Sequence, residues 1–256
     1  MNPPRPLTLD LRPFGLIGLA VGFVLATYVA ASTWERVRVR PVVRTIQVTG
    51  SAKKRIVSDL IEWRATVEST AVDRAEAYQS LHAQTTKAEA FLVERGVDKG
   101  EIWVSAASVR PIYETEYVGS GEDRIQRQVL RGYESSQSLV VRSKEVALIE
   151  KMSREITQLQ GDGVLVTSDD PEYFYTRLGD VKIEMLAEAS RDARTRAENI
   201  VGSAGGAHLG TLRSADMGVI NVNPANSTAG SWDGNNDTTA LEKDIITIIH
   251  ATFELE

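Results

Sequence analysis

An uncharged apolar run from Phe14 to Thr33 limits what this chain can fold into more than any other feature. Its twenty residues are long enough to cross a bilayer as one helix, and no later stretch of the sequence has this character. We therefore expect a single transmembrane anchor at 14–34. A tail at 1–13, a basic linker at 35–43 and one large domain at 44–256 complete the expected organisation.

The residues around this run give conflicting signals for its orientation. Four arginines follow the run and two precede it, so a count of basic residues would place the large domain in the cytoplasm. The short basic leader, the apolar core and the small residues Val29, Ala30 and Ala31 instead have the layout of a secretory signal, with cleavage after Ala31 as an alternative. We favour an uncleaved anchor with an exported domain.

Small residues recur at every fourth position of the run, at Gly18, Gly22, Ala26 and Ala30. On a helix they form one stripe, which lets a second backbone approach closely in lipid. We therefore name these four positions as candidate interaction residues. A plain anchor of ordinary transmembrane composition explains the same pattern.

Composition excludes several classes of site. The chain has no cysteine, which rules out disulfides, thiolate catalysis and cysteine-bound metals. It carries 35 acidic and 29 basic residues, and six of the arginines lie in residues 1–44. The large domain is therefore acidic and a poor partner for nucleic acid. The histidines His82, His208 and His250 stand far apart, and we expect no cofactor.

Apolar periodicity predicts an α+β fold with antiparallel sheets and helices packed on one face. Strand patterns occupy 44–51, 60–69, 101–117, 124–143, 164–168, 172–177, 210–219 and 244–255, and helical patterns occupy 73–95, 144–159 and 179–204. Gly132 interrupts the fourth strand pattern and is expected to mark a bulge or bend. The last helix carries one methionine and three alanines at fourfold spacing, which would let it lie close to a sheet or to a partner subunit: Met185, Ala189, Ala193 and Ala197.

Three tryptophans lie in this domain. Trp63 and Trp103 fall in strand patterns and are expected in the core. Trp232 lies in a long loop at 221–239 that is rich in Asn, Gly, Ser and Thr, and we expect this loop to be unstructured or to form a contact surface. A Trp in a polar loop often marks a contact, so Trp232 is a further candidate interaction residue.

The same loop carries oxygen-bearing side chains whose spacing imitates a calcium loop, at Asp233, Asn235, Asp237 and Asp244. Thr238 stands where the sharp turn of such a loop needs glycine, and no flanking helices are predicted. A flexible acidic loop is therefore the favoured interpretation, and weak calcium binding is the alternative.

Several segments together resemble one known family, the SIMPL-domain proteins. They are the opening strand Ile46-Gln-Val-Thr-Gly50, the stretch Gly132–Arg142, the helix Ala187–Glu198, the Gly205 to Gly210 exit and the terminal strand. Each motif is loose, but their order and spacing over roughly 44–256 are fairly specific. The approach to the last strand differs, because Leu241-Glu-Lys-Asp244 replaces the Pro-Gly segment that family members often have.

The resemblance implies a bacterial envelope protein with an N-terminal signal or anchor, a tendency to self-associate and links to envelope or oxidative stress. The anchor at 14–34 would then lie in the inner membrane, with 1–13 in the cytoplasm and 44–256 in the periplasm. The family has no agreed catalytic residues, and none are carried over to this chain.

We therefore expect a non-enzymatic, membrane-anchored SIMPL-type protein that acts through self-association and contacts with other envelope proteins. One alternative is a small-molecule or metal-binding module with the 221–239 loop as its lid. A second is a hydrolase whose catalytic groups meet only in the folded chain, with His208 or His250 beside an Asp and a Ser.

Overall fold

The computed structural model describes residues 12–38, 44–119 and 124–256, and within 12–38 it describes the side chains of 20–35 only. Helix α1 spans Arg12–Arg38 and contains the apolar run. Over the described residues, no helix reaches the combination of length and apolar character that spanning a membrane requires. The segment expected to be a transmembrane anchor is therefore helical, and its role as a membrane span is not supported.

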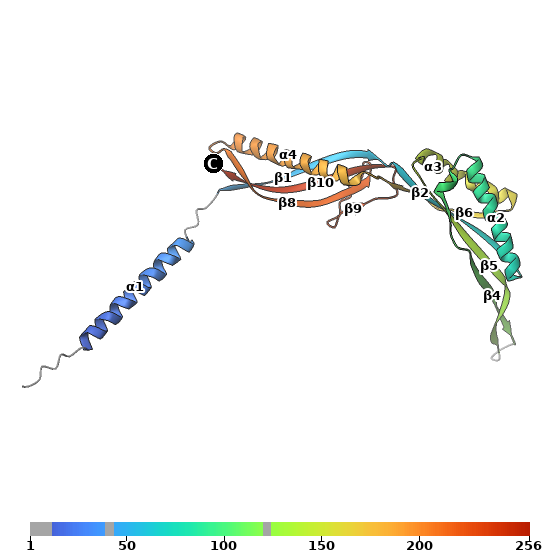
Figure 1. The fold of residues 1–256 in the computed structure, drawn as a ribbon, viewed down its shortest axis with the longest axis horizontal. Coiled ribbons are helices and arrows are strands. Elements are labelled where there is room, and N and C mark those ends of the chain that lie inside the picture. Colours follow the sequence, from blue (N-terminus) through green and yellow to red (C-terminus); the bar gives the residue numbers. More distant parts are fainter. Residues whose placement is uncertain (1–11, 39–43, 120–123) are drawn as a thin grey trace, which may run out of the picture.

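The remaining described residues fold as two lobes that lie end to end (Figure 1). The first lobe is a four-stranded sheet in the order β1 (Thr45–Val57), β10 (Glu242–Leu255), β8 (Leu209–Pro224) and β9 (Asn235–Asn236). Its pairs are antiparallel except β8–β9, which is parallel. Helix α4 (Leu178–Ala204) packs on one face, against β1 and β10.

The second lobe is a six-stranded antiparallel sheet whose chain segment is inserted between β1 and α4. Its main path is β3 (Ile102–Val104), β5 (Ile125–Ser143), β2 (Leu60–Ala71) and β6 (Leu165–Ser168), while β4 (Ser108–Val118) pairs with β5 and β7 (Glu172–Phe174) pairs with β2. Helices α2 (Arg74–Glu94) and α3 (Val146–Glu155) pack against it, together with short 3₁₀ turns at Lys99–Glu101 and Ile156–Asp162. The expected α+β class with antiparallel sheets is confirmed.

Close packing of α4 on β1 depends on small residues in both elements. The predicted ladder is fully buried, with 0% exposure at Met185, Ala189, Ala193 and Ala197. Opposite it lies Gly50, where a Cβ atom would collide with the carbonyl oxygen of Ala189 and with Ala193. The ladder therefore does what its spacing predicts, and Gly50 is its counterpart on the strand.

The tryptophan predictions are half right. Trp63 is buried, and its Nε1 donates a hydrogen bond to Ser168 Oγ at 2.9 Å. Trp103 is 62% exposed, so its expected place in the core is wrong. Because strand side chains alternate between two faces, the neighbours Ile102 and Val104 take the inward positions of this three-residue strand and Trp103 points outward.

A buried lysine ties the two lobes together. Lys243, on β10, is 2% exposed, and its ammonium group donates to the carbonyl oxygen of Tyr173 at 2.6 Å and to that of Asp237. Tyr173 belongs to β7 of the second lobe, and its N–H donates to the carbonyl of Thr238 at 2.7 Å. Burial lowers the pKa of Lys243, because it penalises the charged form.

Candidate functional site

The segment between β8 and β10 is ordered by asparagine side chains rather than unstructured. Asn223 is fully buried, and its Nδ2 donates to the carbonyl of Ala229 at 2.6 Å. Its Oδ1 accepts from Asn235 Nδ2 at 2.8 Å, and Asn221 Oδ1 accepts from the N–H of Ser231 at 3.1 Å. Together with the short parallel pairing of β8 and β9, these amides hold the loop beside β8.

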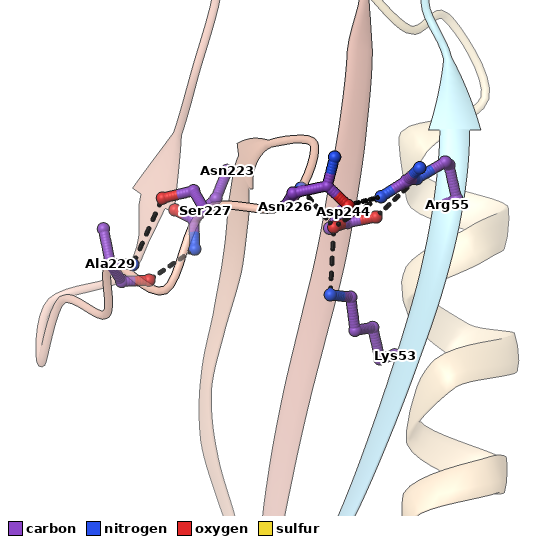
Figure 2. A network of polar contacts seen from close by, with 7 residues as sticks. All are labelled: Lys53, Arg55, Asn223, Asn226, Ser227, Ala229 and Asp244. Atoms are coloured by element: carbon purple, nitrogen blue, oxygen red, sulfur yellow. Dashed lines mark hydrogen bonds and ion pairs between the residues drawn. The ribbon is translucent and has the colours of Figure 1, made fainter.

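Asp244 fixes the other end of this loop, as Figure 2 shows. Its buried carboxylate accepts from Arg55 Nε at 3.0 Å and from the N–H of Asn226 at 2.8 Å, and it pairs with Lys53 at 3.0 Å. Asn226 turns the chain in a left-handed conformation, with φ at 66°. Hydrogen bonding from Arg55, followed by that from Asn226, lowers the pKa of Asp244 far below its usual range.

The four calcium candidates do not converge. The Asp244 carboxylate accepts the hydrogen bonds drawn in Figure 2, and the side chain of Asn235 donates to that of Asn223. Asp237 caps its own turn, accepting from Thr239 Oγ1 at 2.8 Å, while Asp233 is exposed. Across the described residues, no group of three or more His, Asp or Glu side chains is arranged to hold a metal ion. The similar spacing therefore reflects hydrogen bonds that order the loop.

A cavity of about 500 Å³ lies between this loop and strands β8 and β10. It is lined by Asp216, Met217, Gly218, Val219, Asn221, Gly230, Ser231, Trp232, Ile248 and His250. Trp232 is 96% exposed at its rim, and Asn221 is buried. A Cβ atom at Gly218 would lie 2.9 Å from the carbonyl oxygen of Ile248, so only glycine fits at this position of β8 without a shift of the backbone.

This cavity brings together the groups that a hydrolase would need, but it does not connect them. Asp216, Ser231 and His250 all line it. His250 Nδ1 lies 3.0 Å from Thr49 Oγ1, and Ser231 Oγ accepts from the N–H of Asp233 at 3.3 Å. Within the described chain, no hydrogen bond joins Ser231 to His250 or His250 to Asp216. The arrangement lacks the base-to-nucleophile contact of an activated serine.

A second candidate surface is the hairpin of β4 and β5, which projects from the second lobe (Figure 1). The pairing slips between Ile112 and Tyr113, opposite Gly132, so the predicted bulge is confirmed. Arg131, at this bulge, pairs with Glu114 at 2.5 Å and Glu116 at 2.6 Å. The arm exposes large apolar side chains at Ile112, Tyr113, Tyr117, Val118, Ile125 and Leu130.

The sequence patterns did not single out this arm, although one signal was available. Apolar side chains occur on both strands near the hairpin end, without the regular alternation that a sheet with one buried face produces. Among the other interaction candidates, Gly22, Ala26 and Ala30 are exposed on α1, and Gly18 lies outside the residues whose side chains are described.

The comparisons with known proteins give one result. Residues 46–248 match the model of the family SIMPL, described as a protein of unknown function (DUF541). The match begins in β1 and ends in β10, so it includes both lobes. A search of the curated proteins gives no match.

Proposed function

This chain belongs to the SIMPL family, and on that basis we propose that it is a non-enzymatic bacterial envelope protein that works by binding other proteins, first of all copies of itself. The observation that carries this proposal is the β4–β5 arm. It is a two-stranded ribbon beyond the body of its lobe, with exposed apolar side chains on both strands. An isolated ribbon of this kind is marginally stable in water, so a partner strand would stabilise it.

A second copy of the chain suits this arm. Past the region where β5 pairs with β2, each strand of the ribbon has an edge whose backbone groups pair with no other strand in the described chain. Two such edges can join by ordinary strand pairing, and tyrosine and isoleucine side chains then pack across the joint. The charged trio of Arg131, Glu114 and Glu116 contains both signs, so it can also pair between copies.

The same proposal places the protein at the inner membrane with its two lobes in the periplasm, where it contributes to envelope or oxidative stress tolerance. Support for the anchor comes from the sequence alone, namely the uncharged run from Phe14 to Thr33. A tether of this kind would raise the local concentration of the arms in the plane of the membrane and favour their pairing.

Single-cysteine cross-linking tests the arm directly, because the natural chain contains no cysteine. In the full chain, produced in bacterial cells, Tyr113→Cys is expected to give a disulfide-linked dimer on a non-reducing gel. Ile183→Cys is the matched control, since Ile183 is an exposed apolar residue on α4, at 70% exposure against 56% for Tyr113. Equal dimer yields from the two variants, or none from either, would remove the arm as the contact.

A small-molecule site is the second candidate function, and the cavity beneath Trp232 favours it. The cavity has an apolar wall, a few polar groups and a volume of about 500 Å³, which is within the range of ligand pockets. A thermal-shift screen of the full chain, repeated with Trp232→Ala, tests this function. A ligand that stabilises both proteins equally would not bind in this cavity.

A further inference from the structure

The chemistry of the cavity beneath Trp232 can be specified further, on the premise of the second candidate function. Its wall is apolar and accessible. The indole of Trp232 is 96% exposed, and Val219 and Ile248 complete the wall. An exposed Trp ring beside an apolar wall forms a flat surface on which an aromatic or aliphatic body can stack.

The polar groups of the cavity have unused hydrogen-bonding capacity. Asn221 is 6% exposed, and its Oδ1 is taken by the N–H of Ser231. In the part of the chain that the structure describes, Asn221 Nδ2 donates to no other group. Asn221 Nδ2 does not belong to the buried side-chain atoms that lack a partner in the described chain, so it remains accessible and can donate to an oxygen of a ligand or a water in the cavity.

The charge of the cavity selects the ligand. Asp216 is its only acidic residue, and no Lys or Arg lines it. Among the described residues the Asp216 carboxylate takes part in no hydrogen bond or ion pair, although it faces His250 across the β8–β10 ladder. An unpaired carboxylate beside an exposed indole attracts a cation, through both the negative charge and the face of the ring.

We propose that this cavity binds an organic amine: its apolar body packs on Trp232 and Ile248, its ammonium group pairs with Asp216, and an oxygen of the ligand accepts from Asn221 Nδ2. Aromatic amines that carry a hydroxyl group meet all three requirements. Organic acids fail the second, because their carboxylate would face Asp216 and no Lys or Arg lines the cavity to compensate the charge.

The test uses the full chain and four related probes: tyramine, phenethylamine, the neutral alcohol tyrosol and the acid 3-(4-hydroxyphenyl)propionate. Isothermal titration is expected to show saturable binding of tyramine, with tyrosol about tenfold weaker and the acid weaker still. Phenethylamine, which lacks the hydroxyl, should fall between tyramine and tyrosol. Asp216→Asn should bring the affinity for tyramine down to that for tyrosol.

Two further variants assign the effect to the cavity. Trp232→Ala should weaken every probe, because the stacking surface is lost. Asp233→Asn removes an exposed carboxylate of the same loop that does not line the cavity, and it should leave all affinities unchanged. Thermal melting of each variant shows whether it folds.

The outcomes separate the inference from its premise. If tyramine and tyrosol bind equally well to the natural chain, and both lose affinity in Trp232→Ala, the ligand site stands and its preference for amines is wrong. The inference also fails if Asp216→Asn and Asp233→Asn weaken tyramine by the same factor. If none of the four probes binds up to about 10 mM, both the inference and the small-molecule function fail.

Discussion

At the scale of single residues, Gly50 sets how closely α4 lies on β1. A methyl group at this position would meet the backbone of Ala189 and the side chain of Ala193, neither of which can move without shifting the helix. Gly50→Ala is therefore expected to lower the free energy of unfolding by about 2 kcal/mol, as overpacked cores do. Urea denaturation of the full chain measures this change.

Gly179→Ala is the control for that substitution. Gly179 lies near the start of the same helix, and a Cβ atom there would have no neighbour within 4 Å. Because alanine favours the helix, this variant should be as stable as the natural chain or more stable by roughly 0.5 kcal/mol. If both variants lose stability equally, the close approach at Gly50 is not the cause.

Asp244 makes the stability of the first lobe depend on pH. Its pKa is lowered in the folded chain, chiefly by the hydrogen bond from Arg55, so the folded state holds this proton less tightly than the unfolded state does. The resulting stabilisation is complete above the unfolded pKa of about 4 and is lost as the pH falls below it. Asp244→Asn should therefore cost about 2 kcal/mol at pH 7, and the gap to the natural chain should narrow below about pH 4.

Urea denaturation at several pH values measures the difference in free energy of unfolding between Asp244→Asn and the natural chain, and Asp233→Asn provides the comparison. The side chain of Asp233 is exposed and makes no ion pair in the described structure, so this variant should follow the natural chain across the pH range. If the free energy of unfolding of Asp244→Asn stayed below that of the natural chain by the same amount down to pH 2, the ionised Asp244 carboxylate would not be the source of the stabilisation.

At the scale of elements, the β4–β5 arm is held by its own ladder and by a cross-strand ion cluster. Arg131 bonds Glu114 and Glu116 on the facing strand, with roughly half of its side chain exposed. Because exposed ion pairs contribute little to global stability, Arg131→Ala should leave the unfolding of the lobes unchanged. It should instead speed hydrogen exchange of the arm amides, because local opening of the ribbon becomes easier.

Hydrogen exchange followed by mass spectrometry measures this local effect. Arg194→Ala removes a comparable exposed pair with Glu198, formed within α4 rather than across strands. It should not alter exchange in the arm. Unchanged arm exchange in Arg131→Ala would mean that the ladder alone holds the hairpin.

At the scale of the whole molecule, Lys243 couples the lobes. Its buried ammonium group binds the carbonyl of Tyr173 in the second lobe and that of Asp237 in the loop. Lys243→Met keeps the length of the side chain but leaves both carbonyls without a donor. It should lower stability by about 2 kcal/mol and separate the unfolding of the two lobes into two calorimetric transitions.

Lys87→Met serves as its counterpart, because Lys87 is exposed on α2 and makes no ion pair in the described chain. Calorimetry of this variant should give the profile of the natural protein. A single transition at an unchanged temperature for Lys243→Met would show that the lobes are joined by other contacts.

Much of each element could be predicted from local sequence. The alternation around Trp63, the ladder from Met185 to Ala197 and the bulge at Gly132 all follow from neighbouring residues, because strand and helix periods place side chains on fixed faces. The prediction that Trp103 lies in the core was wrong for a related reason. A three-residue strand is too short for its pattern to show which face is buried.

The sequence by itself therefore determined the fold class, the family and the elements that carry the two cores. Only the tertiary structure decided the division into two lobes, the tie at Lys243 and the cavity beneath Trp232. These features depend on partners far apart in the chain, as with Thr49 and His250, which are 201 positions apart yet lie 3.0 Å from each other through their side chains. Local periodicity indicates which face of a helix or strand is apolar. Which element packs against that face depends on how the strands pair across the whole chain.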